Sequence, residues 1–139
     1  MLQWQPKHVT LVDLDTELMQ LFKNPHEKLP HSLANEIETL NAASLRDERV
    51  NIISADAFIA IDTLLQSQQT FDAIIVDLPD PSHPDLNKLY SVNFYARLKQ
   101  LLAGDGLIGI QSASPYHAKN AFIAIGKTVQ AAGYSSVQQ

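Results

Sequence analysis

The sequence predicts an α/β fold in which a parallel sheet is flanked by helices. Strand-like apolar runs alternate with helical patterns along the chain, and this order is typical of parallel sheets. The run from Ala73 to Val76 has no polar alternation, as expected for a strand covered on both faces. The chain has 139 residues, of which 45% are hydrophobic, which is enough for one core. We therefore expect a single domain over residues 1–139.

Four strands are predicted, each a short run of mainly apolar residues. They comprise His8 to Leu14, Val50 to Ser54, Ala73 to Asp77 and Leu107 to Gln111. Ligands of parallel sheets bind beyond the carboxyl ends of the strands. The residues at these ends are therefore the candidates for a functional site.

The last predicted helix has the clearest pattern. Apolar residues recur at steps of four and three, which places them on one face. They are Ala118, Phe122, Ile125, Val129 and Ala132. Gly133 follows as a C-terminal stop, and we expect the apolar face to pack on the sheet.

Two further helices are expected over Ala57 to Gln66 and Ser91 to Leu102, the second ending before a Gly104-Asp105-Gly106 turn. Residues 24–49 are expected to begin with a proline-rich break and to contain a short helix around Leu33 to Leu40. Three aromatic residues at helical spacing are interpreted as packing residues rather than as a stacking platform. They are Tyr90, Phe94 and Tyr95.

Composition and missing motifs exclude several classes of function. The net charge of -5, without a basic run, argues against a nucleic-acid binder. The absence of cysteine excludes disulfides and thiolate ligands, and the five histidines show no metal-binding spacing, so we expect no metal site. No glycine-rich phosphate loop occurs. There is neither a long apolar span nor a signal-peptide pattern, which predicts a cytoplasmic chain.

Acidic residues stand at the ends of the first three predicted strands. Asp13 can accept both hydroxyls of a ribose or cap the next helix, and the two readings are equally open; for Asp15 capping is favoured. Asp56 alone is more often a helix N-cap, although it can accept a hydrogen bond from an adenine amino group. With Asp77 at the third strand, one acidic rim is a better account than three coincidental caps.

The loop after the third strand carries two carboxylates, Asp77 and Asp80, three residues apart. Turn chemistry explains both residues, because Asp and Pro favour tight loops. The functional interpretation is preferred, since two anions can hold a diamine and one of them can accept a proton from its nitrogen. Gln111 ends the fourth strand and is either an edge residue or an amide that orients an amine.

Five segments together resemble the spermidine synthases, which are polyamine aminopropyltransferases. The segments are Val9 to Asp15, Arg49 to Ala57, Phe71 to Pro81, Leu89 to Tyr95 and Gly106 to Gln111. The resemblance runs from about residue 8 to 134 and implies a Rossmann-like sheet of the S-adenosylmethionine-dependent methyltransferase type. It begins at the family's second strand, so we expect a domain that is incomplete at its N-terminus, without the first strand and the glycine-rich loop.

The resemblance also implies how a nucleoside would bind. Asp13 would bind the ribose of decarboxylated S-adenosylmethionine, and Asp56 with Ala57 would hold the adenine. The product would be methylthioadenosine, and no other cofactor is implied.

For the second substrate, the resemblance implies an amine such as putrescine. Asp77 would be the general base, Asp80 would steer the amine from the loop, and Gln111 would contact its putrescine side. The chain would therefore serve polyamine biosynthesis, although we expect little or no activity from the isolated chain.

The missing strand would leave the runs Val9 to Leu14 and Ala73 to Asp77 with unpaired edges. We expect these strands to close on one another, or another chain to supply the pairing in a homo-oligomer. The pair Leu78-Pro79 is similar to bacterial relatives with membrane-spanning segments, which leaves a membrane-associated parent protein open.

Two other functions remain as alternatives. The first is a methyltransferase-like nucleoside binder, which would bind S-adenosylmethionine at least as well as its decarboxylated form. The second is a receiver-like signalling domain with Asp13 and Asp15 as acidic pair, Asp77 as phosphoacceptor and Ser112 as hydroxyl. The long spacing between the acidic pair and Asp77 argues against the receiver.

Overall fold

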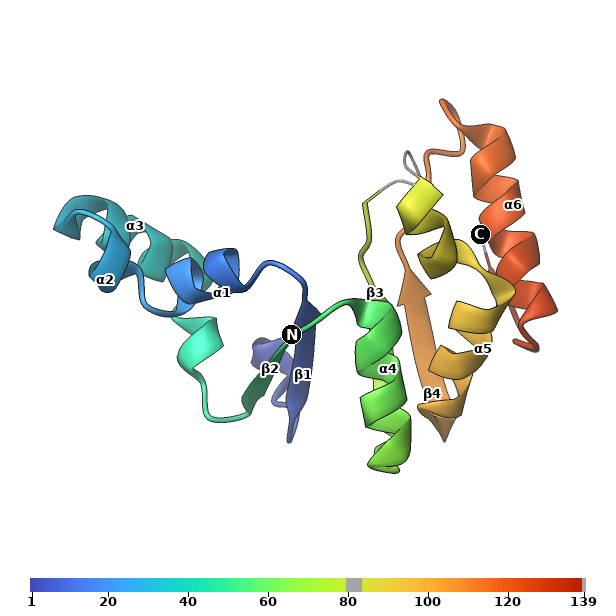
Figure 1. The fold of residues 1–139 in the computed structure, drawn as a ribbon, viewed down its shortest axis with the longest axis horizontal. Coiled ribbons are helices and arrows are strands. Elements are labelled where there is room, and N and C mark those ends of the chain that lie inside the picture. Colours follow the sequence, from blue (N-terminus) through green and yellow to red (C-terminus); the bar gives the residue numbers. More distant parts are fainter. Residues whose placement is uncertain (80–83, 139) are drawn as a thin grey trace. The chain divides into compact units, whose positions relative to one another are not determined.

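The computed structural model describes residues 1–79 and 84–138 (Figure 1). The chain divides into two compact units, Met1–Ala60 and Ile61–Gln139. Each unit has its own two-stranded parallel sheet with helices beside it. The expected single domain over residues 1–139 stays a prediction.

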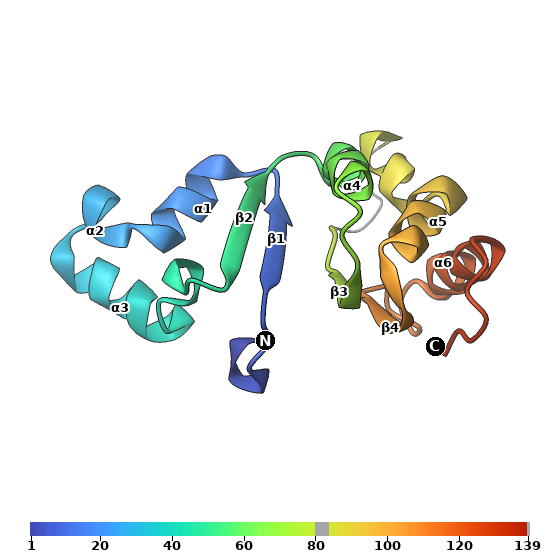
Figure 2. The same ribbon diagram turned by 90° about the horizontal axis from the view of Figure 1, so that it is seen from below.

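The sheet of the first unit pairs β1 (Val9–Asp13) with β2 (Val50–Ser54). The two strands are parallel and in register from Val9 opposite Val50 to Asp13 opposite Ser54, and they lie side by side in Figure 2. The bounds of β2 are those predicted, and β1 is one residue shorter at each end than the predicted run.

A short 3-10 helix, η1 (Leu2–Trp4), precedes β1. Four short helices lie between β1 and β2: α1 (Thr16–Lys23), α2 (Pro25–Lys28), α3 (His31–Asn41) and η2 (Ser44–Arg46). The predicted helix around Leu33 to Leu40 is confirmed as α3. Pro25 occupies the first turn of α2, where its missing N–H would have no helical partner.

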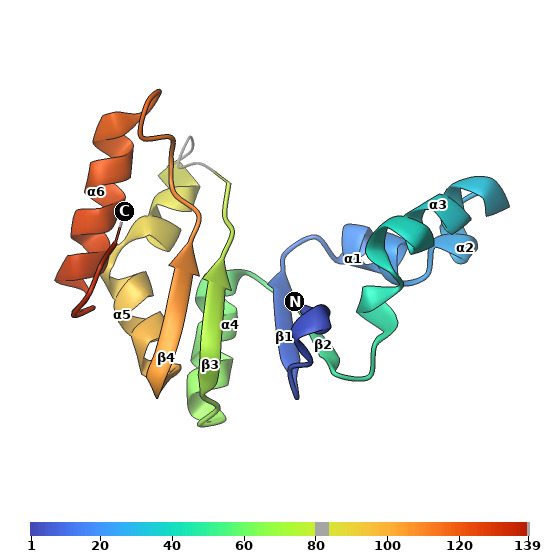
Figure 3. The same cartoon turned by 180° about the vertical axis from the view of Figure 1, so that it is seen from behind.

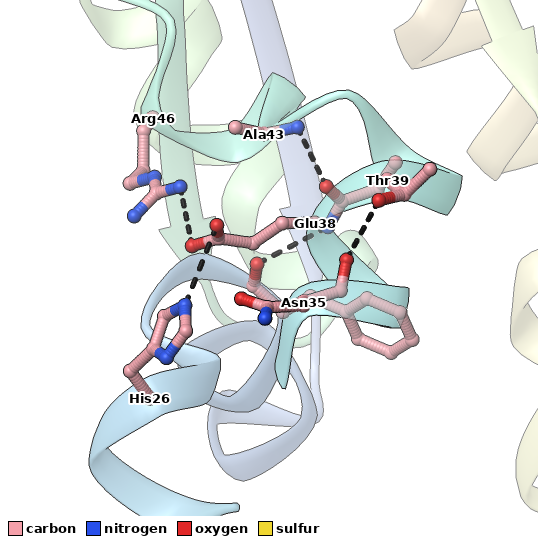
Figure 4. Close-up of polar contacts among 8 residues, drawn as sticks. His26, Asn35, Glu38, Thr39, Ala43 and Arg46 are labelled. Carbon is pink, nitrogen blue, oxygen red and sulfur yellow. Dashed lines mark hydrogen bonds and ion pairs between the residues drawn. The ribbon is translucent and has the colours of Figure 1, made fainter. Parts of the chain in front are cut away.

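Glu38 of α3 connects three of these segments (Figure 4). Its Oε1 accepts a hydrogen bond from Arg46 at 2.5 Å, and its Oε2 lies 3.4 Å from Nε2 of His26. Burial raises the pKa of Glu38, but the hydrogen bonds from Arg46 and His26 outweigh this and leave the pKa below its ordinary value. The carboxylate therefore links α2, α3 and η2.

The second unit contains most of α4 and the remaining elements. They are α4 (Ala57–Gln66), β3 (Phe71–Val76), η3 (Pro84–Tyr90), α5 (Val92–Gln100), β4 (Leu102–Ile110) and α6 (Lys119–Ala131). The bounds of α4 match the prediction. In Figure 3, β3 and β4 lie side by side, with α5 and α6 on the same side of β4.

The predicted Gly104-Asp105-Gly106 turn lies inside β4, which corrects the expected boundary between helix and strand. The ladder pairs Phe71 with Leu102 and then Ala73 with Leu107, so β4 carries extra residues at this point. The glycine-containing segment is accommodated as a bulge in the ladder rather than as a turn before the strand.

The core of the second unit lies between the sheet and its helices. Phe94 and Tyr95 of α5 are 2% and 0% exposed, which confirms them as packing residues. Ile125 and Val129 of α6 are buried and, together with Ile108 of β4, line a cavity of about 290 Å³. The predicted apolar face of α6 is thus turned toward the sheet.

One expectation about the strands is wrong. Ile75 of β3 is 59% exposed and Leu107 of β4 is 76% exposed, so β3 is not covered on both faces. Sheet pairings in residues 1–79 and 84–138 run β1 to β2 and β3 to β4. Because β1 and β3 belong to different units, their expected closure on one another, or pairing through another chain, stays a prediction.

Candidate active site

Asp13 is the last residue of β1 and lies beside the end of β2. Its carbonyl oxygen accepts a hydrogen bond from the backbone N–H of Ala55 at 3.0 Å. Its Oδ1 accepts one from the N–H of Asp15 at 2.7 Å, which fixes the carboxylate over the strand end. The parallel pairing therefore brings the segments containing Asp13 and Asp56 together at one edge of the first sheet. Asp77 belongs to the second unit, so the single acidic rim of all three residues stays a prediction.

Asp15 and Asp56 each use one carboxylate oxygen to cap the start of a helix. Oδ1 of Asp15 accepts from the N–H of Leu18 at 2.9 Å at the start of α1, which confirms the favoured capping role. Oδ1 of Asp56 accepts from the N–H of Phe58 at 2.8 Å, next to Ala57 as the first residue of α4. Capping and nucleoside binding were both open for Asp56, and the structure has the geometry of a cap.

Asp77 and Gln111 stand at the carboxyl ends of β3 and β4. The N–H of Gln111 donates to the carbonyl oxygen of Val76 at 2.8 Å, one step beyond the last registered pair, Val76 with Ile110. The side chains of Asp77 and Gln111 are exposed. The second unit therefore presents a carboxylate and an amide at the carboxyl ends of two neighbouring strands, and their roles stay predictions. Asp80 lies outside the described residues.

The side chain of Tyr90 makes a contact with Pro79 that the sequence does not predict. Its hydroxyl donates to the carbonyl oxygen of Pro79 at 2.7 Å and lies 3.4 Å from that of Leu78. Tyr90 is half-buried, unlike the two aromatic residues that follow it in α5. No pattern in the sequence indicates this hydrogen bond, because its two partners are eleven residues apart.

Two tyrosines of the second unit have raised pKa values, and burial is the main cause. Burial, reinforced by Tyr90 and Tyr134, raises the pKa of Tyr95 to about 12. Burial also raises the pKa of Tyr134 to about 12. Both phenols are therefore neutral near pH 7. Among the residues that the structure describes, no group of three His, Asp or Glu side chains is arranged to hold a metal ion.

Comparison with known proteins connects this geometry to a family. The pattern of the spermine/spermidine synthase domain matches residues 1–138. A polyamine aminopropyltransferase from Shewanella oneidensis is 51% identical over 137 residues, which are 99% of this chain and 24% of the relative. Polyamine aminopropyltransferase 1 from Streptomyces coelicolor is 39% identical over 132 residues, which are 95% of this chain and 23% of the relative. The chain thus spans about a quarter of the length of these relatives.

A solved structure gives the same fold. The crystal structure of spermidine synthase from Thermotoga maritima matches with a TM-score of 0.65 at 18% identity, covering 89% of this chain and 36% of that chain. This likeness confirms the Rossmann-like α/β fold with parallel strands and flanking helices. The matches give no support to the methyltransferase-like or receiver-like alternatives. None of the helices in the described part of the chain is long and apolar enough to cross a membrane.

Proposed function

The chain belongs to the spermine/spermidine synthase family, and from this premise we propose that it is the substrate-holding part of a polyamine aminopropyltransferase. The reaction would move an aminopropyl group from decarboxylated S-adenosylmethionine to a putrescine-like amine. The observation that carries the proposal is that the exposed residues Asp77 and Gln111 directly follow the carboxyl ends of two paired parallel strands, β3 and β4.

Asp77 would act on the amine. An alkylammonium has a pKa of roughly 10, like lysine, and its nitrogen has no lone pair until the proton is removed. The carboxylate of Asp77 accepts that proton, and Gln111 orients the amine through its side-chain amide. Asp80 would attract the second ammonium group of a diamine.

The freed nitrogen then attacks the carbon beside the sulfonium. A carbon–nitrogen bond forms while the carbon–sulfur bond breaks, and the electron pair of that bond stays on sulfur. The leaving group is methylthioadenosine, a neutral thioether, so the step needs orientation and charge stabilisation more than acid catalysis of departure. We propose no metal and no covalent enzyme intermediate.

The nucleoside would bind to the first unit. Asp13 would accept hydrogen bonds from the ribose hydroxyls, and Asp56 with Ala57 would hold the adenine. Two observations support this: Asp13 closes β1, and its carbonyl oxygen is bonded to Ala55, the residue before Asp56. A homo-oligomer and a cytoplasmic location stay predictions.

Calorimetric titration with methylthioadenosine tests the nucleoside half. We expect micromolar binding that Asp56→Ala abolishes. Because Asp56 also caps α4, Asp15→Ala is the matched control: it removes an equivalent side-chain cap on α1 and keeps the backbone N–H that donates to the Asp13 carboxylate. Equal loss in both variants, or binding unaffected by Asp56→Ala, would contradict the assignment.

Titration with putrescine tests the amine half. Asp77→Asn keeps the shape of an exposed side chain but removes its charge, and it should weaken putrescine binding about tenfold or more, as for a charge-assisted hydrogen bond. Asp72→Asn removes an equally exposed charge from the beginning of the same strand and should leave binding nearly unchanged. If both variants weaken binding alike, attraction to the acidic chain as a whole explains it.

A further inference from the structure

We infer that Tyr90 is a positioning residue, whose hydroxyl holds residues 77–79, which follow β3, so that the Asp77 carboxylate is presented to the amine. The inference rests on the proposed function for the role of Asp77. The observation is the hydrogen bond of 2.7 Å from the Tyr90 hydroxyl to the carbonyl oxygen of Pro79, with that of Leu78 at 3.4 Å.

Asp77 lies between two points at which the main chain is held. On its N-terminal side, the carbonyl oxygen of Val76 accepts from the N–H of Gln111 at 2.8 Å. On its C-terminal side, the Pro79 carbonyl accepts from Tyr90. The ring of Pro79 also fixes φ at its own position, so few backbone torsions remain free in this segment. A side chain on such a segment is presented with little loss of backbone entropy.

The backbone at Tyr90 is held on both sides. Tyr90 ends η3, and the next residue, Ser91, is the N-cap of α5. The Ser91 hydroxyl donates to the carbonyl oxygen of Lys88 at 2.7 Å and accepts from the N–H of Phe94 at 3.2 Å. Leu89, on the other side of Tyr90, is 8% exposed. The Tyr90 backbone is therefore held by a capped helix and a buried leucine, and its hydroxyl can restrain residues 77–79.

If Tyr90 acted only through the packing of its aromatic ring, replacing it by phenylalanine would leave residues 77–79 unchanged. Tyr90→Phe keeps the ring and removes only the donor, so any effect on the loop comes from the hydrogen bond. Tyr134→Phe is the matched control, because it also removes one hydroxyl bonded to a backbone carbonyl of the same unit, that of Tyr95 at 3.1 Å. That hydrogen bond lies away from the loop of Asp77 in the sequence and involves none of its residues.

The first test needs no ligand. Nitrogen-15 relaxation of the backbone amides of Asp77 and Leu78 is measured in the wild type, Tyr90→Phe and Tyr134→Phe. We expect lower order parameters at these two amides in Tyr90→Phe alone. Unchanged values at both amides in Tyr90→Phe, or the same change in Tyr134→Phe, would show that the Tyr90 hydroxyl does not hold residues 77–79.

The second test separates positioning from general stability by comparing two ligands. Loss of one neutral hydrogen bond corresponds to about a two- to tenfold change in affinity. We expect Tyr90→Phe to weaken putrescine binding by this factor and to leave methylthioadenosine binding unchanged. Equal weakening of both ligands, or of neither, would overturn the positioning role.

The two proposals fail in different ways. If Asp77→Asn binds putrescine like the wild type, the proposed role of Asp77 is wrong, and the relaxation measurement alone decides whether Tyr90 holds the loop. If Asp77→Asn weakens putrescine binding and Tyr90→Phe does not, the proposed function stands and the positioning role of Tyr90 is wrong.

Discussion

The hydroxyl of Tyr134 donates a hydrogen bond of 3.1 Å to the backbone carbonyl oxygen of Tyr95, which joins the segment after α6 to the middle of α5. Lys99 of α5 strengthens the same connection, because its ammonium donates to the carbonyl oxygen of Gly133 and lies 5.9 Å from the centre of the Tyr134 ring. The end of α6 is therefore fastened to α5 by groups from both sides.

Tyr134→Phe should lower the free energy of unfolding by about 1 kcal/mol, the usual net value of a neutral hydrogen bond. Urea unfolding followed by circular dichroism measures the change. Tyr116→Phe is the control, because Tyr116 is 91% exposed and its hydroxyl should matter little. An equal effect in both variants would mean that the Tyr134 hydrogen bond contributes nothing specific.

Tyr95→Phe should act in the opposite direction. The side chain of Tyr95 is fully buried, and its hydroxyl oxygen has no hydrogen-bond partner among the residues that the structure describes. Burying an unsatisfied polar group costs about 1–3 kcal/mol, so removing it should leave stability unchanged or raise it by about 1 kcal/mol. A clear loss of stability in the same urea assay would show that the hydroxyl does have a partner.

Alkaline pH should destabilise the second unit through Tyr95 and Tyr134. Burial is the main cause that raises the pKa of each to about 12, whereas an exposed tyrosine has a pKa of about 10. Because the folded state disfavours the phenolate, this contribution is fully present below pH 10 and is lost as the pH rises toward 12. Unfolding curves across this range should shift, and the double variant Tyr95→Phe/Tyr134→Phe should shift less. An identical pH dependence in the double variant would rule out these phenols as the cause.

Gly106→Ala should destabilise the bulge in β4. A Cβ added there would meet the carbonyl oxygens of Phe71 at 3.0 Å and Ala103 at 3.1 Å, and backbone atoms in a ladder cannot easily move. We expect a loss of about 1–3 kcal/mol, as for overpacking. Gly104→Ala is the matched control in the same bulge, because a Cβ there meets nothing within 4 Å. Thermal unfolding compares the two variants, and equal melting temperatures would refute the steric argument.

Some elements could be predicted because the residues that define them are close together in the sequence. The strand Val50–Ser54 and the helix Ala57–Gln66 have the predicted bounds, because an apolar run and an acidic residue at a helix start are local signals. The same holds for Asp15 as a cap and for Gly133, whose φ of 92° suits a residue without a Cβ.

Other features depend on partners distant in the sequence. The Gly104-Asp105-Gly106 segment was expected to be a turn, because its glycines give no indication that β3 continues the ladder on both sides of the bulge. The hydrogen bond of Tyr90 to Pro79 requires the intervening chain to fold back, which no periodicity encodes. The proximity of the segments containing Asp13 and Asp56 was predictable, because parallel pairing alone brings the ends of β1 and β2 to one edge.

The two anchors around Asp77 have a consequence for how this loop can evolve. One joins the backbone amide of Gln111 to the backbone carbonyl of Val76, and the other ends on the backbone carbonyl of Pro79. Neither involves the side chain at position 77, a residue that is exposed. Mutation can therefore exchange that side chain without disturbing its scaffold, and a library of substitutions at this single codon would sample different chemistries on one unchanged backbone.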